Sequence, residues 1–270
     1  MPKSMLFLLI LAFLGCASPH PAPEALQEVL PWMFQHWDEA ADEEIAKYFV
    51  QMEGAATPVN NENPMKGTIG NLQAENVAKY NLDPGVHDVS KARGVFIFNA
   101  FKCSLHQLER VLIDRDQTNL YPDQYLGYER IYSTNADDYK ARKTNFLRWQ
   151  TNLTASKTVA TLTETLEGGV RFIPDLGKEK SPYGAAIVQW TLMPNPASLD
   201  DPSYFWKQDY QIEMYTERAP GEILHAYGMW RQVYVTSLFD SNTDGFVSRV
   251  TGALIDWDKM TEDDCAAGRP

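Results

Sequence analysis

Apolar residues change their spacing along the chain, and this change separates a helical part from a strand-rich part. Between Glu24 and Glu53 they recur three or four residues apart, a pattern typical of one buried helix face. Pro31 can begin a second helix at its first position or kink a single helix; we expect a short turn there and then a helix over about 31–53. Residues 54–70, rich in Gly, Pro and Asn, are expected to form a loop.

The strand-rich part begins with Gly94–Phe98, a continuous apolar run typical of a strand covered on both faces. Ser104 and Gln107 then form a Ser-x-x-Gln capping box, which predicts a short helix. Seven further strands are predicted, over 125–133, 145–155, 158–166, 170–173, 185–193, 205–216 and 223–235.

Two turns and one last helix complete the pattern. Gly168-Gly169 and Ala219–Glu222 have the composition of hairpin turns. Apolar residues at helical spacing between Phe246 and Trp257 predict a short closing helix before an acidic end. We therefore predict an α+β fold: an antiparallel sheet of about seven to eight strands with a C-terminal helix, preceded by an acidic helical extension.

This order of elements resembles the helix-grip order of the START and Bet v 1-like superfamily, over about 93–260. The resemblance implies an apolar pocket between the sheet and the closing helix. Aromatic residues of the predicted strands would line it; plain core packing is the alternative. The candidates for this pocket are Trp149, Trp190, Tyr210, Tyr215, Tyr227 and Trp230.

The N-terminus has the layout of a signal peptide: an apolar run over 5–14 followed by Gly15-Cys16-Ala17-Ser18. Phe13–Cys16 resembles a bacterial lipobox, in which the cysteine becomes the lipidated first residue. Ordinary secretory cleavage after Ala17 is the alternative. The predicted organisation is a signal peptide (1–15), a lipid-anchored Pro-rich tether (16–23), the acidic extension (24–92) and the α+β domain (93–265).

Charge and cysteine content narrow the possible partners and compartment. The net charge of -12 argues against nucleic acid as a partner. Nine acidic residues against one lysine fall between Glu24 and Glu62, on the expected wet face of the helical extension. Export would permit a disulfide between Cys103 and Cys265, worth about 4–5 kcal/mol in the chain-entropy model; two free thiols are the alternative.

One loop has the spacing of a calcium site. Asp240, Asn242 and Asp244 occupy the first, third and fifth positions of an EF-hand-like loop, and Gly245 follows them. The twelfth position is Thr251, which lacks the usual bidentate carboxylate. An Asx-rich turn before the closing helix is the alternative, so calcium is the one cofactor considered.

Three functions follow from these features. The first is a membrane-anchored envelope lipoprotein, facing the periplasm or cell surface, that binds a hydrophobic small molecule or lipid without chemistry. The second is an interaction lipoprotein whose acidic helix engages other envelope proteins. The third is an enzyme that uses His225, the one histidine in a well-predicted strand, although the sequence identifies no carboxylate partner for it.

Overall fold

The structure, a computed structural model, describes residues 21–55, 59, 63–121, 124–157, 160–177, 184–236 and 239–268. The expected signal peptide and Cys16 lie outside the described residues, as does most of the tether. Among the helices that the structure describes, none is both long and apolar enough to cross a membrane.

One antiparallel sheet of ten strands organises the described chain. Its main path runs β1-β2-β9-β8-β6-β5-β4-β3, and the two-residue strands β7 and β10 pair with β5 and β9. The strands are β1 (Met65–Ile69), β2 (Arg93–Lys102), β3 (Gly127–Tyr132), β4 (Phe146–Lys157), β5 (Ala160–Ile173), β6 (Ala186–Leu192), β7 (Ser198–Leu199), β8 (Phe205–Ala219), β9 (Glu222–Thr236) and β10 (Phe239–Asp240). The predicted antiparallel α+β fold is confirmed, although β1 lies in a segment expected to be a loop.

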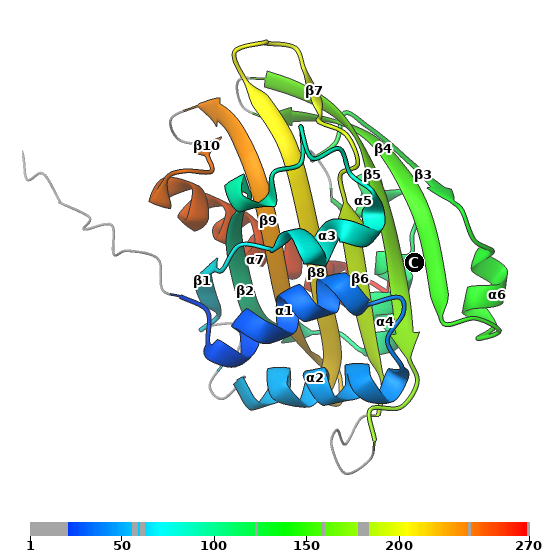
Figure 1. The fold of residues 1–270 in the computed structure, drawn as a ribbon. Coiled ribbons are helices and arrows are strands. Elements are labelled where there is room, and N and C mark those ends of the chain that lie inside the picture. The colour runs from blue at the N-terminus through cyan, green and yellow to red at the C-terminus, as the bar shows by residue number, and fades with distance from the viewer. Residues whose placement is uncertain are drawn as a thin grey trace, which may run out of the picture.

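Helices cover both faces of this sheet. In Figure 1, α1 (Glu24–His36), α2 (Asp42–Ala55) and α3 (Ala74–Val77) lie in front of the strands, and α7 (Asp244–Ala266) runs behind them. Helices α4 (Leu105–Leu112) and α5 (Gln117–Leu120) contact α7, and α6 (Ala136–Lys140) contacts β4. Short 3-10 turns occupy Ala78–Tyr80 and Val89–Lys91. The C-terminal helix against an antiparallel sheet is the helix-grip arrangement expected from the element order.

The break between α1 and α2 falls at residues 37–41, whereas the sequence analysis placed it at Pro31. Pro31 lies inside α1. The side chain of Arg171, 5% exposed, donates hydrogen bonds to the carbonyls of Trp37 and Ala40 at 2.8 Å and to Asp42 at 2.5 Å. In a continued helix, backbone N–H groups would have bonded to these carbonyls; here the Arg171 side chain does so instead. A residue of β5, about 130 positions away in the sequence, therefore fixes the turn between α1 and α2.

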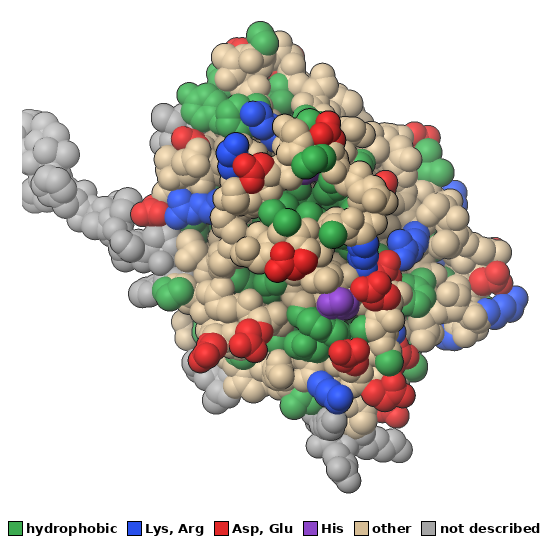
Figure 2. Space-filling model, in the orientation of Figure 1, with side chains coloured by type: hydrophobic (Ala, Val, Ile, Leu, Met, Phe, Trp, Pro, Cys, Tyr) green, Lys and Arg blue, Asp and Glu red, His purple; other side chains and the backbone are tan. Residues whose placement is uncertain are grey.

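The front helices share a core with the sheet. The Phe34 ring lies within about 6 Å of the rings of Trp190, Tyr210 and Trp230, centroid to centroid. Acidic side chains cover the outer face of α1 and α2, as Figure 2 shows for Asp and Glu over these helices. The acidic extension is therefore a structural layer, and deleting residues 24–53 would expose the sheet as well as remove the acids.

The interpretation of Gly168-Gly169 as a hairpin is wrong, because β5 runs straight through both residues. A Cβ on Gly168 would lie 2.3 Å from Nε1 of Trp149, and one on Gly169 would lie 2.6 Å from the ring of Trp37. The two glycines leave room for one tryptophan on each face of the sheet. The other predicted turn is confirmed, since Gly221 joins β8 to β9 with a φ of +72°.

Helix α7 has 23 residues and is not the short closing helix that the sequence analysis expects. The apolar stripe ends near Trp257, but the buried face continues with Asp258, Thr261, Asp264 and Cys265. Beyond Trp257 the buried side of the helix consists mainly of polar residues. Hydrophobic periodicity does not detect a helix of this kind, so the prediction ended too early.

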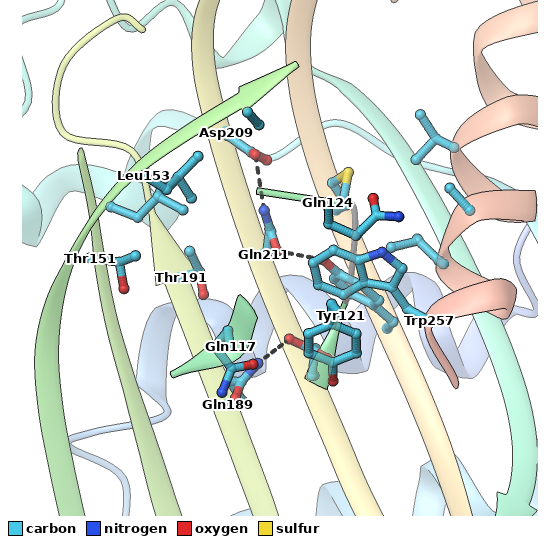
Figure 3. A pocket seen from close by; sticks show the side chains of 18 of the residues that line it. Gln117, Tyr121, Gln124, Thr151, Leu153, Gln189, Thr191, Asp209, Gln211 and Trp257 are labelled. Atoms are coloured by element: carbon cyan, nitrogen blue, oxygen red, sulfur yellow. Dashed lines mark hydrogen bonds between the residues drawn. The ribbon is translucent and has the colours of Figure 1, made fainter. Parts of the chain in front are cut away.

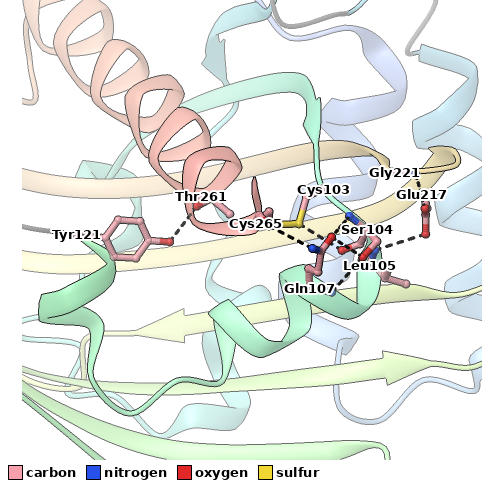
Figure 4. Close-up of a disulfide and its surroundings, with 9 residues drawn as sticks. All are labelled: Cys103, Ser104, Leu105, Gln107, Tyr121, Glu217, Gly221, Thr261 and Cys265. Atoms are coloured by element: carbon pink, nitrogen blue, oxygen red, sulfur yellow. Dashed lines mark hydrogen bonds between the residues drawn. A yellow bond between two sulfur atoms is a disulfide. The ribbon is translucent and has the colours of Figure 1, made fainter. Parts of the chain in front are cut away.

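A disulfide between Cys103 and Cys265 fastens the end of α7 to the end of β2, with the two Cα atoms 5.5 Å apart. Figure 4 shows Gln107, at the first turn of α4, beside this bond; its Nε2 donates to the Cys265 carbonyl at 3.1 Å. Ser104 caps α4 as predicted, with the capping box complete. The bond closes a long segment of the chain, because its cysteines are 162 positions apart.

Gly169→Ala is expected to lower the free energy of unfolding by about 2–3 kcal/mol, because Trp37 is fully buried and cannot move aside. Gly168→Ala should cost less, since Trp149 borders a cavity into which its ring can turn. Gly252→Ala, in α7 with open space around the new methyl, is the control and should be neutral or slightly stabilising. Urea unfolding of the three variants measures this order, and equal losses for all three would contradict the argument.

Replacing both Cys103 and Cys265 by serine is expected to lower the free energy of unfolding by about 4–5 kcal/mol, because the unfolded chain regains the entropy of a long loop. Urea unfolding of the double variant against the parent protein measures the loss. A thiol titration of denatured, unreduced Cys16→Ser protein should find no free thiol, and two free thiols would disprove the bond.

Candidate functional site

A cavity of about 370 Å³ lies between the sheet and α7. This volume falls at the small end of the range of about 300–1,000 Å³ that is usual for ligand pockets. Figure 3 shows side chains from β4, β6 and β8 pointing toward the same space as Tyr121 and Trp257, whose rings stack at 4.7 Å. The apolar part of the lining includes Trp149, Leu153, Leu166, Tyr227, Met229, Val250, Leu254 and Trp257.

Half of the aromatic residues predicted for the pocket line this cavity. Trp149, Tyr215 and Tyr227 do so. Trp190, Tyr210 and Trp230 belong instead to the core under α1, on the opposite face of the sheet. The prediction ignored alternation: residues 210 and 215, or 227 and 230, are an odd number apart on one strand and must point to opposite faces.

A cluster of charged and polar groups forms one part of the cavity wall. His225, only 2% exposed, donates from Nδ1 to Oδ1 of Asp258 at 2.9 Å, and its Nε2 lies 3.5 Å from Oε2 of Glu213. Gln189 donates to the other Glu213 oxygen at 2.5 Å, and the Tyr215 hydroxyl donates to Oε2. We call these five residues, His225, Asp258, Glu213, Tyr215 and Gln189, the histidine cluster.

The electrostatics of the cluster keep His225 charged. Burial alone would lower the pKa of His225, but the carboxylates of Asp258 and Glu213 outweigh burial and raise this pKa to about 9. At neutral pH the cluster therefore holds an imidazolium between two acidic side chains. Burial, with the Glu213 charge next in importance, raises the pKa of Tyr215 well above its usual value, so its hydroxyl keeps its proton.

A second polar group lies along the same wall. Arg231 donates to Oδ2 of Asp209 at 2.5 Å, and Gln211 donates to the same oxygen at 2.9 Å. The Tyr227 hydroxyl donates to Gln211, and the Arg231 guanidinium lies over the Trp206 ring at 4.3 Å. This network crosses β8 and β9, and within the described structure it leaves Asp209 Oδ1 and Arg231 Nε buried without a hydrogen-bond partner.

Sequence reasoning singled out His225 but missed its partners. Asp258 lies on the buried stripe of α7, three to four residues after Leu254 and before Thr261, so helical spacing could have identified it. Glu213 alternates with Ile212 and Met214 and therefore faces the cavity. Among the residues that line the described cavity there is no serine or cysteine that could act as a nucleophile beside His225.

The loop predicted to bind calcium connects β10 to α7. Asp240 accepts hydrogen bonds from both the backbone and the side-chain nitrogen of Asn242 at 2.9 Å, and Thr243 caps α7. Asp244 is the first residue of α7 and pairs with Arg93 at 2.7 Å. Within the described residues, no group of three His, Cys, Asp or Glu side chains is placed to hold a metal. Calcium binding by this loop stays a prediction.

The chain matches no family model and no curated protein. Solved structures resemble it in fold. A START superfamily protein from Mycobacterium smegmatis is 10% identical, with a TM-score of 0.41, over 64% of this chain and 97% of that one. Human StAR-related lipid transfer protein 5 is 7% identical, with a TM-score of 0.40, over 84% of this chain and 95% of that one. An aromatase/cyclase from a Streptomyces species is 8% identical, with a TM-score of 0.35, over 63% and 92%. At these identities the likeness concerns the fold alone and assigns no ligand.

Proposed function

We propose that this protein binds a hydrophobic small molecule or a single-chain lipid in the cavity between the sheet and α7, without chemistry. The observation that carries the proposal is the cavity itself. A gap of about 370 Å³ lies beside aromatic and aliphatic side chains, in a fold whose other face buries a hydrophobic core under α1. A well-formed apolar pocket with a few convergent polar groups is the usual form of a ligand site.

The same proposal places the protein outside the cytoplasm, anchored by a lipid on Cys16. The signal-peptide layout and the lipobox-like residues Phe13–Cys16 support it. The Cys103–Cys265 disulfide is independent support, because such bonds persist in oxidising compartments and are rare in the cytosol. The residues up to Pro19 would keep the domain at a distance from the membrane. Pro21 bridges to Thr68 of β1 and Pro23 caps α1, so the expected tether of 16–23 ends before Pro21.

Thr151→Trp is expected to weaken ligand binding by at least about tenfold, because Thr151 lines the cavity and the indole would fill it. Binding is measured from the fluorescence of the uncharged probe N-phenyl-1-naphthylamine. Thr154→Trp is the matched control, since it lies on the same strand but faces the other way, and should bind as the parent does. A parent protein that does not bind the probe, or equal binding by both variants, would contradict the proposal.

Cys16→Ser is expected to move the protein from the membrane fraction to the soluble fraction, because the acceptor of the lipid is lost. Fractionation of cells that export the full chain, followed by immunoblotting, measures the shift. The control is Cys103→Ser, which leaves Cys16 in place and should keep the protein in the membrane fraction. An unchanged distribution of the Cys16→Ser protein would remove the lipoprotein part of the proposal.

A further inference from the structure

We propose that the histidine cluster binds the polar end of the ligand and selects an uncharged amphiphile with a hydroxyl group over one with a carboxylate. The inference rests on the proposed function, since it concerns the same cavity. It adds a substrate class, which the apolar part of the lining does not specify.

The histidine cluster has one hydrogen-bond donor and one acceptor that no group of the described structure satisfies. His225 Nε2 and Gln189 Oε1 are buried, and neither makes a hydrogen bond within the described structure; Nε2 has only its 3.5 Å contact with Glu213 Oε2. Both atoms belong to residues that contact the Glu213 carboxylate. This carboxylate accepts a hydrogen bond from Gln189 Nε2, so Gln189 Oε1 must be the end of the amide that faces away from it. One atom requires an acceptor and the other a donor. A hydroxyl supplies both, whereas a carboxylate or a ketone only accepts.

The charge of the histidine cluster also disfavours a carboxylate. Asp258 and Glu213 contribute two negative charges to the cluster and His225 one positive charge, so a ligand carboxylate would enter a site that is already net negative. Like charges in a poorly hydrated site repel strongly, whereas a hydroxyl adds no charge.

The arginines of the cavity wall do not reverse this preference. Arg231 is paired through Nη2 with Asp209 at 2.5 Å; its Nε is buried without a partner in the described structure, but it lies beside that same carboxylate. Arg130 donates to the carbonyls of Leu112 and Asp114 at 2.6 and 3.0 Å. Arg249, the remaining arginine of the lining, is exposed to solvent. An anionic head group would have to approach the Asp209 carboxylate to reach Arg231, displace the partners of Arg130, or stay at the surface beside Arg249, outside the buried cluster.

The test compares two probes with the same chain, dodecanol and dodecanoate, on the full chain at neutral pH. Each competes with N-phenyl-1-naphthylamine, and we expect dodecanol to displace it at a concentration at least about tenfold lower. Gln189→Leu, which keeps the size of the side chain, should reduce this preference several-fold. Thr191→Val is the matched control, because Thr191 also lines the cavity from β6 but lies outside the cluster, and it should keep the preference.

The outcomes separate the inference from the proposed function. If the parent protein does not bind the naphthylamine, the proposed function fails. If it binds the naphthylamine but dodecanoate competes as well as dodecanol, the proposed function stands and the selection for a hydroxyl is overturned. If dodecanol is preferred but Gln189→Leu behaves like Thr191→Val, the cluster is not the selecting element. The comparison on the parent protein decides the selectivity even if a variant fails to fold.

Discussion

The need to cover both faces of the central strands governs this structure. Strands β6, β8 and β9 lie inside the sheet, and alternate residues along them point to opposite sides. On one side, Trp190, Tyr210 and Trp230 surround Phe34, and this contact binds α1 tightly to the sheet. On the other side the same strands present polar groups such as Gln211 and Glu213. A hydrophobic core on one face and a partly polar cavity on the other follow from a single alternation of residue types.

Helix α7 covers the second face without filling the space beneath it. Near its middle, Asp258 binds His225 and also accepts from Asn99 at 2.9 Å, and near its end the disulfide joins it to β2. Between these fastenings and the sheet, the stacked rings of Tyr121 and Trp257 occupy part of the gap. The first half of the helix packs apolar residues such as Phe246 and Val247 against the sheet, whereas its second half is held mainly by these polar and covalent contacts beside the cavity.

Local patterns predicted the kinds and order of most of the larger elements, because helical and alternating periodicities are properties of short segments; β1 was missed. They failed where a distant residue decides the outcome. Arg171 ends α1, and the rings of Trp37 and Trp149 explain two glycines in mid-strand. Neither contact is visible in the local sequence. The prediction that six aromatic residues line one pocket failed for a different reason. Alternate residues of a strand point to opposite faces, and this rule, applied to the sequence, would have separated Tyr210 from Tyr215.

The histidine cluster brings together residues of three strands and one helix, so no spacing rule could have assembled it. Its position in a cavity wall has an energetic consequence. Buried charged groups are costly to desolvate, and apolar residues of the same size often give a more stable protein. If stability alone determined the cavity wall, we would expect leucine, methionine or tryptophan at these positions too, as in the apolar part of the wall. Here it holds an imidazolium between two carboxylates, with one donor and one acceptor unmatched. A ligand hydroxyl could complete the hydrogen bonds of both atoms. The buried charges that lower stability would then serve to recognise the ligand.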